Sequence, residues 1–117
     1  MEKVTLFLIS FFLLLCGVGF AQQKLDVNHL PELERYITDF TDTLTLEELN
    51  ELEAIAENYY EASTNQLVAV VIPDRQGREL FDIGIKIFNE NGIGEKGKNN
   101  GLLLLIAKNE KKIRIVV

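Results

Sequence analysis

Two uninterrupted apolar segments dominate the second half of this chain, and each is bounded by polar or turn-forming residues. The first, residues 67–72, is followed by Pro73, and the second, residues 102–107, is preceded by Gly101. Apolar runs of this length without polar alternation are typical of strands that are covered on both faces. We therefore expect two buried strands, the first of them at the centre of a sheet.

Helical patterns precede each of these strands. Thr45 and Glu48 form the capping box of a helix that begins at Leu46, and residues 63–65 supply its end. Its apolar positions recur at helical spacing, at Leu49, Leu52, Ile55 or Ala56, and Tyr59. A second helix is expected from about residue 79 to 91, with Gly92 as its left-handed C-terminal residue.

The end of the chain reads as a β-hairpin, with a turn at 108–111 and a third strand at 113–117. The order helix, strand, helix, strand, strand predicts an α/β layer in which helices pack on a small mixed sheet. The first two strands should be parallel because a helix connects them, and the last two should be antiparallel. Residues 30–37 fit either a helical turn or an extended lead-in, because Pro31 permits both.

Residues 1–21 have the features of a secretory signal peptide. An apolar run follows Lys3, and Gly19 and Ala21 place small residues where a signal peptidase cleaves. The run is too short for a stable transmembrane anchor. Cys16 raises a lipoprotein alternative, which the bulky Leu15 before it disfavours. The polar residues 22–35 are expected to form a flexible leader, so the folded domain should span 36–117.

The net charge of −6 argues against several partners. The predicted signal peptide contains one Lys and one Glu, so residues 22–117 carry the same net charge. An acidic surface repels phosphate backbones, which excludes nucleic acid as an expected partner. Residues 22–117 contain no Cys, and His29 is the only histidine, which we expect at the surface. The residues of the chain thus offer little for nucleophilic or general-base catalysis.

The glycine-rich stretch at residues 92–101 imitates two phosphate-binding signatures. A phosphate-binding reading would place Lys96 and Lys98 against the anion. Phosphate loops, however, follow a strand and open a helix, whereas a helix precedes this stretch and a strand follows it. The order therefore predicts a bend that feeds a sheet.

Four segments together resemble the TPM domain: residues 37–40, 44–48, 64–68 and 92–105. The last is the most specific, since it carries the family's GIGxKG and NG elements before a leucine-rich strand. The resemblance covers about residues 36–117 and implies a three-layer α/β/α sandwich. In the family the domain continues beyond the region matched here, so the resemblance implies a chain that is truncated at its C-terminus.

The resemblance also implies export to the periplasm, the cell envelope or the exterior, and acid phosphatase activity or divalent-metal binding in some members. The family's early Asp falls on Asp39, and the Asp of its DNG element falls on Asn99. The two acids of its DDR element fall on Asn109 and Glu110. Two carboxylates have thus become amides, which keep an oxygen ligand but lose the charge.

Asp39, Asn99, Asn100 and Glu110 are therefore candidate ligands of a weak site for Ca²⁺ or another divalent cation, with Asp42 as a further candidate. The alternative is that Asp42 orders the turn before Thr45 and that residues 99–101 form a turn at the entrance of a strand. The favoured function is an exported accessory or interaction module whose partner is an envelope protein of unknown identity. The alternative is a metal-assisted phosphatase acting on phosphomonoesters, in which Lys96 or Lys98 receives the phosphate.

Overall fold

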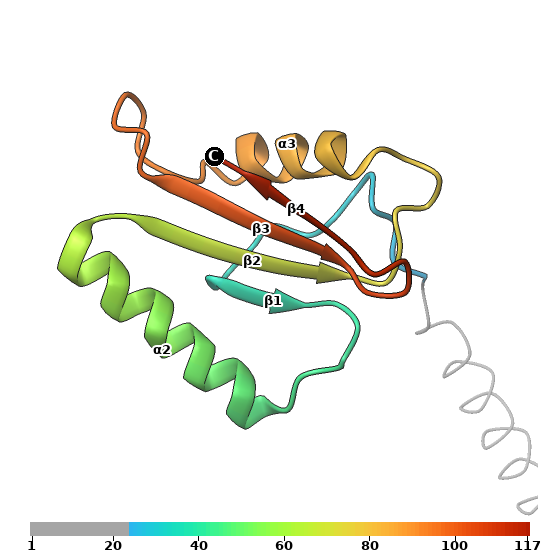
Figure 1. Ribbon diagram of the computed structural model, residues 1–117, viewed down its shortest axis with the longest axis horizontal. Coiled ribbons are helices and arrows are strands. Elements are labelled where there is room, and N and C mark those ends of the chain that lie inside the picture. Colours follow the sequence, from blue (N-terminus) through green and yellow to red (C-terminus); the bar gives the residue numbers. More distant parts are fainter. Residues whose placement is uncertain (1–23) are drawn as a thin grey trace, which may run out of the picture.

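The computed structural model describes residues 24–117, so the predicted signal peptide and Cys16 lie outside the described residues. Four strands form one mixed sheet in the order β1-β2-β3-β4 (Figure 1). The elements are β1 (Ile37–Asp39), α2 (Leu46–Ser63), β2 (Gln66–Ile72), α3 (Leu80–Glu90), β3 (Gly101–Ala107) and β4 (Lys112–Val116). β1, β2 and β3 are parallel, and β4 is antiparallel to β3. The mixed α/β sheet and the parallel and antiparallel pairings are confirmed.

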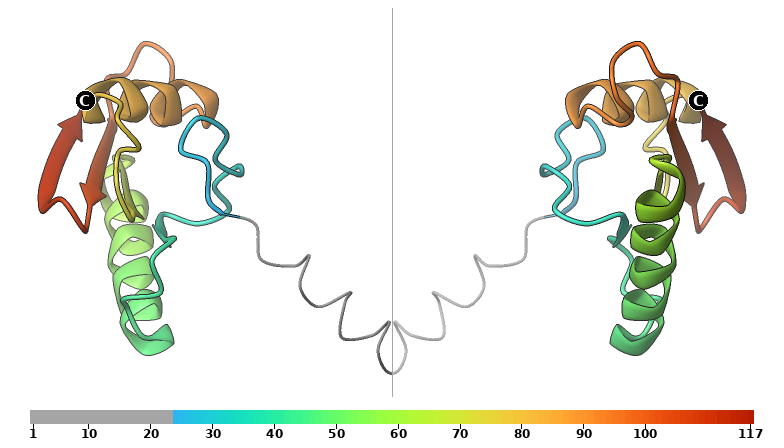
Figure 2. Two further views of the ribbon diagram at one scale, coloured as in Figure 1. Left: turned by 90° about the vertical axis from the view of Figure 1, so that its right-hand side faces the viewer. Right: turned by 90° about the vertical axis from the view of Figure 1, so that its left-hand side faces the viewer.

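The two helices lie on opposite faces of the sheet, which gives the predicted three layers (Figures 1 and 2). α2 contacts β1 and β2, whereas α3 contacts β3 and β4. The core lies on the α3 side, where every second residue of β2 and β3 is buried, including Val70, Leu103 and Leu105 at 0% exposure. Strand side chains alternate between the two faces, so the intervening residues face α2.

Local capping explains where α2 begins. The Thr45 hydroxyl accepts a hydrogen bond from the Glu48 backbone N–H at 3.1 Å, and the Glu48 carboxylate accepts one from the Thr45 N–H at 3.0 Å. The predicted capping box is confirmed. At the end of α3, Gly92 takes the left-handed conformation, with φ of 59°.

β1 has no strong signal in the sequence, and contacts with α2 fix its position. The Glu53 carboxylate of α2 accepts hydrogen bonds from the backbone N–H groups of Tyr36 and Ile37, both at 2.8 Å. These bonds satisfy the first donors of a strand of only three residues, which pairs with β2 from Ile37 to Asp39. Of the two readings of residues 30–37, the extended lead-in is the one observed.

Residues 24–35, expected within a flexible leader, instead pack against α3. Val27 is only 2% exposed and belongs to the core, with Leu30 and Leu33 packed beside it. Polar contacts hold the segment in place: the Gln76 side chain accepts from the Val27 N–H and donates to the Leu25 carbonyl. The segment is ordered because its few apolar residues share one side and its backbone groups find side-chain partners.

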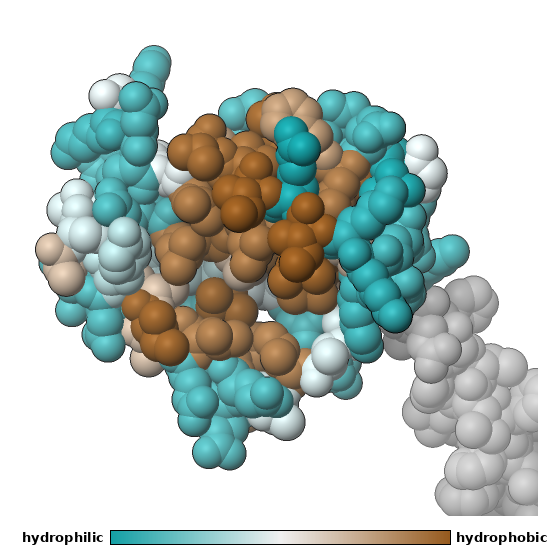
Figure 3. Space-filling model, in the orientation of Figure 1, coloured by the Kyte–Doolittle hydropathy of each residue, from teal (hydrophilic) through white to brown (hydrophobic). Residues whose placement is uncertain are grey.

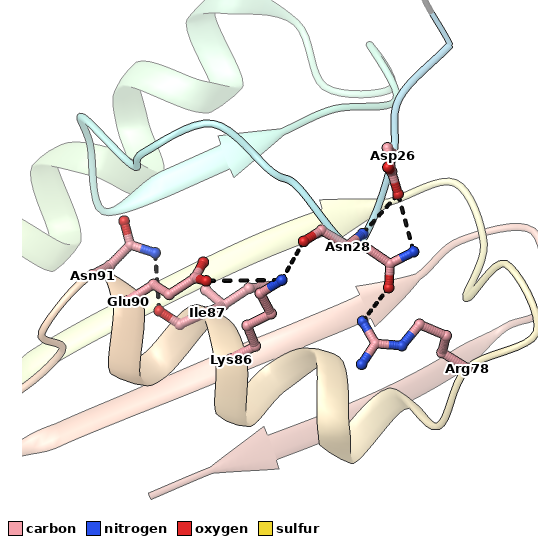
Figure 4. Close-up of polar contacts among 7 residues, drawn as sticks. All are labelled: Asp26, Asn28, Arg78, Lys86, Ile87, Glu90 and Asn91. Carbon is pink, nitrogen blue, oxygen red and sulfur yellow. Dashed lines mark hydrogen bonds and ion pairs between the residues drawn. The ribbon is translucent and has the colours of Figure 1, made fainter.

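Figure 4 shows the polar contacts between this segment and α3. Arg78 donates to the Asn28 side chain, and the Lys86 ammonium donates to the Asn28 carbonyl. Lys86 also lies 3.8 Å from the Glu90 carboxylate. Asn28 is therefore held by Arg78, which precedes α3, and by Lys86, which lies within α3.

The packing of Val27 generates a stability prediction. Replacing a buried valine by alanine leaves a small cavity, so Val27→Ala should lower the free energy of unfolding by about 1 to 3 kcal/mol. Val117→Ala is the matched control, because Val117 is 80% exposed and should change stability by less than about 0.5 kcal/mol. Urea unfolding followed by circular dichroism measures both. Equal stability of the two variants would contradict the docking of the N-terminal segment.

Candidate functional site

Within the glycine-rich stretch, the backbone around Gly94 packs closely against the backbone at the start of β3, at the amino edge of the parallel strands. Gly94 lies against Gly101, the first residue of β3, so a Cβ on Gly101 would come within 2.7 Å of the Gly94 nitrogen. A Cβ on Gly94 would come within 2.8 Å of the Gly101 nitrogen. Both positions therefore require glycine, and Gly94 also has a φ of +79°.

Two amide side chains fasten this loop to the rest of the sheet. The Asn100 side chain accepts from the Glu95 N–H at 2.6 Å and donates to the Thr64 carbonyl at the end of α2 at 2.7 Å. The Gln66 side chain accepts from the Gly94 N–H at 2.8 Å. Asn100 is buried, at 9% exposure, so its hydrogen bonds are made away from water.

These bonds weigh against a phosphate cradle. A phosphate loop needs backbone N–H groups free to point at the anion, whereas those of Gly94 and Glu95 already donate to Gln66 and Asn100. The loop follows α3 and leads into β3, so neither of the two described helices presents its N-terminus to it. The prediction of a bend that feeds the sheet is confirmed.

The two lysines of this loop are on its surface. Lys96 is exposed, and the Lys98 ammonium lies 2.6 Å from the Glu95 carboxylate. The hydrogen bond to Glu95 raises the pKa of Lys98. Lys98 is thus paired within its own loop, and its charge is screened by water.

Asp39 ends β1 and organises the loop before α2. Its Oδ1 accepts from the backbone N–H and the hydroxyl of Thr41, and its Oδ2 accepts from the N–H groups of Thr43 and Leu44. A carboxylate offers about four lone-pair sites, and these four bonds use them all. Burial acts to raise the pKa of Asp39, but the hydrogen bonds outweigh it and hold that pKa below its ordinary value.

Glu110, in the turn between β3 and β4, is bound to an arginine. Its carboxylate accepts from the Arg75 backbone N–H at 2.6 Å and from Arg75 Nε at 2.9 Å. The backbone bond from Arg75, followed by the bond from its side chain, lowers the pKa of Glu110. The pair fixes the β3–β4 turn to the loop after β2.

The structure does not gather the four predicted metal ligands in one place. Asp39 lies level with Val71 of β2, which pairs with Ile106, whereas Asn100 immediately precedes β3 at its other end. Six strand residues of about 3.3 Å each separate these levels by roughly 20 Å. Asn99 lies beside Asn100, and Glu110 lies at the Asp39 edge, beyond β3.

One cation therefore cannot touch both the asparagines and Asp39, because Ca²⁺ takes its oxygen ligands at about 2.3 to 2.6 Å. Within residues 24–117, no group of three or more His, Cys, Asp or Glu side chains is arranged to hold a metal ion. Asp42, considered as a further ligand, is exposed in the loop after β1.

An open apolar groove of about 540 Å³ lies on the α2 face of the sheet. Figure 3 shows apolar side chains gathered over β3, β4 and the near side of α2. α2 reaches the sheet through Ala56, which is 1% exposed, but it stands over β1 and β2 only. Its apolar lining includes Leu52, Ile55 and Ala56 of α2, Leu67, Ala69 and Val71 of β2, Leu104 and Ile106 of β3, and Ile115 of β4, and its polar lining includes Asp39, Thr43 and Lys108. We call this set the α2 groove.

Sequence reasoning missed the α2 groove. The apolar runs of β2 and β3 predicted cover on both faces, yet Ile55 is 61% exposed and Ile115 is 55% exposed. Leu104 and Ile106 are half-buried, in contrast to Leu103, Leu105 and Ala107, which alternate with them and are fully buried. The sequence does contain an indication of the groove, because its strands carry more apolar surface than the two predicted helices can cover.

Comparisons with known proteins agree with this architecture. A family model described as the TPM domain matches residues 37–117. The N-terminal domain of a protein from P. gingivalis, solved by solution NMR, superposes with a TM-score of 0.71 at 19% identity over 82% of this chain. The N-terminal domain of the cg2496 protein from Corynebacterium glutamicum does so with a TM-score of 0.61 at 18% identity over 81% of this chain.

These two structures share the fold, and this chain spans 64% of the first and 60% of the second. No curated protein matches the sequence.

The Gly94–Gly101 contact predicts a difference between two glycine substitutions. Gly94→Ala should lower the free energy of unfolding by about 2 to 4 kcal/mol, because it combines positive-φ strain with a backbone clash. Gly97→Ala is the control: its φ is +84°, but nothing lies within 4 Å of the new Cβ, so about 1 kcal/mol is expected. Thermal unfolding measures the difference, and equal losses would contradict the close packing.

The bonds to Asp39 predict a pH dependence. The folded-state pKa lies below the reference value of 3.8, so the ionised carboxylate stabilises the fold above that pH, and this contribution is lost as the pH falls through the folded-state pKa. Asp39→Asn should lower the free energy of unfolding by roughly 1 to 3 kcal/mol at pH 7. It should also reduce the further loss of stability that the wild type shows below about pH 4.

Asp42→Asn is the matched control for this experiment, because Asp42 lies in the same loop and asparagine tolerates its φ of 53° equally well. Urea unfolding between pH 2 and pH 7 distinguishes the two variants. An Asp39→Asn profile parallel to the wild-type profile would refute the role of the carboxylate.

Proposed function

The chain belongs to the TPM domain family, and on this basis we propose that it is an exported module of the cell envelope that binds another protein through its α2 groove. The observation that carries the proposal is the open apolar surface between α2 and β4. Soluble monomers rarely expose large contiguous apolar patches unless those patches bind something. The groove is lined by side chains of α2 and of all four strands.

The chemistry of the described residues supports binding more than hydrolysis. A metal-assisted phosphatase needs carboxylates with free lone pairs that converge on an ion. All four sites of Asp39 are used within its own loop, and Glu110 is neutralised by Arg75. Any affinity for Ca²⁺ in our proposal is therefore weak and has no role in turnover.

The exported location in this proposal rests on the sequence of residues 1–21, which has the pattern of a signal peptide. Within residues 24–117, neither helix is long and apolar enough to cross a membrane. The absence of cysteine from residues 22–117 is compatible with an oxidising compartment.

Site-specific cross-linking tests the proposed module. A photo-reactive amino acid at Ile115, in the α2 groove, should give a discrete cross-linked protein species in cells that express the full chain. The same amino acid at Phe81 should give none, because Phe81 is similarly exposed but lies on α3, on the opposite face of the sheet. Equal labelling from both positions, or none from Ile115, would contradict binding through the groove.

A parallel assay tests the alternative function. The purified protein, with a chromogenic phosphomonoester and added Ca²⁺, Mg²⁺ or Mn²⁺, should show no turnover above that of its Asp39→Asn variant. Metal-dependent turnover that disappears in Asp39→Asn and in Glu110→Gln, while both variants remain folded, would contradict the proposed interaction module and support a phosphatase.

A further inference from the structure

The α2 groove has the dimensions of a site for one helix. α2 covers β1 and β2, which leaves β3 and β4 open on this face. Neighbouring strands lie about 4.8 Å apart, so two uncovered strands give a strip roughly 10 Å wide. A helix with its side chains is about 10 Å in diameter, so a single helix fills the strip.

A suitable helix is present in the same chain. α2 carries an exposed apolar stripe formed by Leu52 at 39%, Ile55 at 61% and Tyr59 at 47% exposure. These residues follow the i, i+3, i+7 spacing of one helix face. Leu52 and Ile55 already line the groove from the side. An unpartnered helix stripe and an unpartnered strip of sheet thus lie next to each other on one molecule.

We propose that the α2 groove is the interface between two copies of this chain, with α2 of each copy lying over β3 and β4 of the other. This inference rests on the proposed function and specifies its partner. A two-fold axis parallel to the strands, lying between the two faces, places each helix over the open strip of the other sheet. The interface is then self-complementary, as two-fold interfaces must be.

The charges of the two rims are complementary in this arrangement. α2 carries six glutamates and no Lys or Arg: Glu47, Glu48, Glu51, Glu53, Glu57 and Glu61. The turn after β3 carries Lys108, which lines the groove, and Lys111. The acid in this turn, Glu110, is already paired with Arg75. The basic rim therefore retains a positive charge.

Topology places these opposite charges at the same level. α2 begins after the carboxyl end of β1, and the β3–β4 turn follows the carboxyl end of β3, which is parallel with β1 through β2. Glu47, Glu51 and the two lysines therefore lie at the same edge of the sheet. A two-fold axis along the strands keeps that edge in common, so the acidic start of each α2 meets the basic turn of the other copy.

The size of the contact predicts a weak dimer. An 18-residue helix is about 27 Å long, so its footprint on the sheet is on the order of 270 Å². Two such contacts, each burying surface on both partners, remove about 1,100 Å², which is the lower end of specific interfaces. Interfaces of this size are typical of weak, transient association, so the dimer should dissociate on dilution.

Sedimentation velocity over a wide range of protein concentration tests the inference with the purified protein. The wild type should change from monomer to dimer as its concentration rises, and Ile115→Glu should weaken association at least tenfold. Phe81→Glu adds the same charge on the opposite face and should leave association unchanged.

Charge exchange provides a sharper test. A variant with Glu47→Lys and Glu51→Lys, and a second variant with Lys108→Glu and Lys111→Glu, should each remain monomeric, because each repels itself at both contacts. Mixed together, they should form a heterodimer, because both contacts become attractive again. Failure of the mixture to associate while the wild type dimerises would overturn the proposed arrangement.

The outcomes also separate this inference from the function on which it rests. A wild type that stays monomeric up to about 1 mM, while Ile115 cross-links a different protein, overturns the dimer and leaves the interaction module standing. A monomer whose Ile115 cross-links nothing overturns both. A cross-linked species of twice the protomer mass supports both.

Discussion

β3 is apolar on both of its faces, and the described chain covers only one of them. Leu103, Leu105 and Ala107 are fully buried against α3 and the N-terminal segment, whereas Leu104 and Ile106 face the α2 groove. Side chains of a strand alternate between the two faces of the sheet, so both sets of apolar side chains cannot be buried on the same face. The uncovered set must therefore meet water or a second surface.

The amino edge of the sheet shows how strongly the position of β3 is determined. Gly94 and Gly101 pack backbone against backbone, and Asn100 joins the loop to the end of α2. Buried hydrogen bonds of this kind are costly to break, so they hold the start of β3 at a single register beside β2. The groove is thus a fixed surface, and its apolar lining is available without rearrangement.

Much of this fold could be predicted from local patterns. The capping box at Thr45 and the glycine at position 92 set helix limits, and two apolar runs set the central strands, because these signals act within a few residues. β1 and the docking of the N-terminal segment could not be predicted in this way. They depend on Glu53 and Gln76, whose partners lie 16 and 49 residues away in the chain.

The candidate site was less predictable for the same reason. Oxygen-bearing residues such as Asp39 and Asn100 suggest metal ligands when only their chemistry is known, but their hydrogen-bond partners in the fold decide whether any lone pair remains. The groove exists because α2 covers only part of this face of the sheet. A local sequence pattern does not show which apolar residues a helix will leave uncovered.

The edges of the sheet help to determine how an exposed apolar surface can be used. An edge strand invites pairing with another chain through its free backbone groups, which leads to open-ended aggregation. Here β1 offers only three residues, and β4 carries Lys112 and Arg114 among its five. Like charges on two β4 strands would repel in an edge-to-edge pair. Association through the face is favoured instead, and because the face is self-complementary, two copies close the interface and leave no free surface for a third.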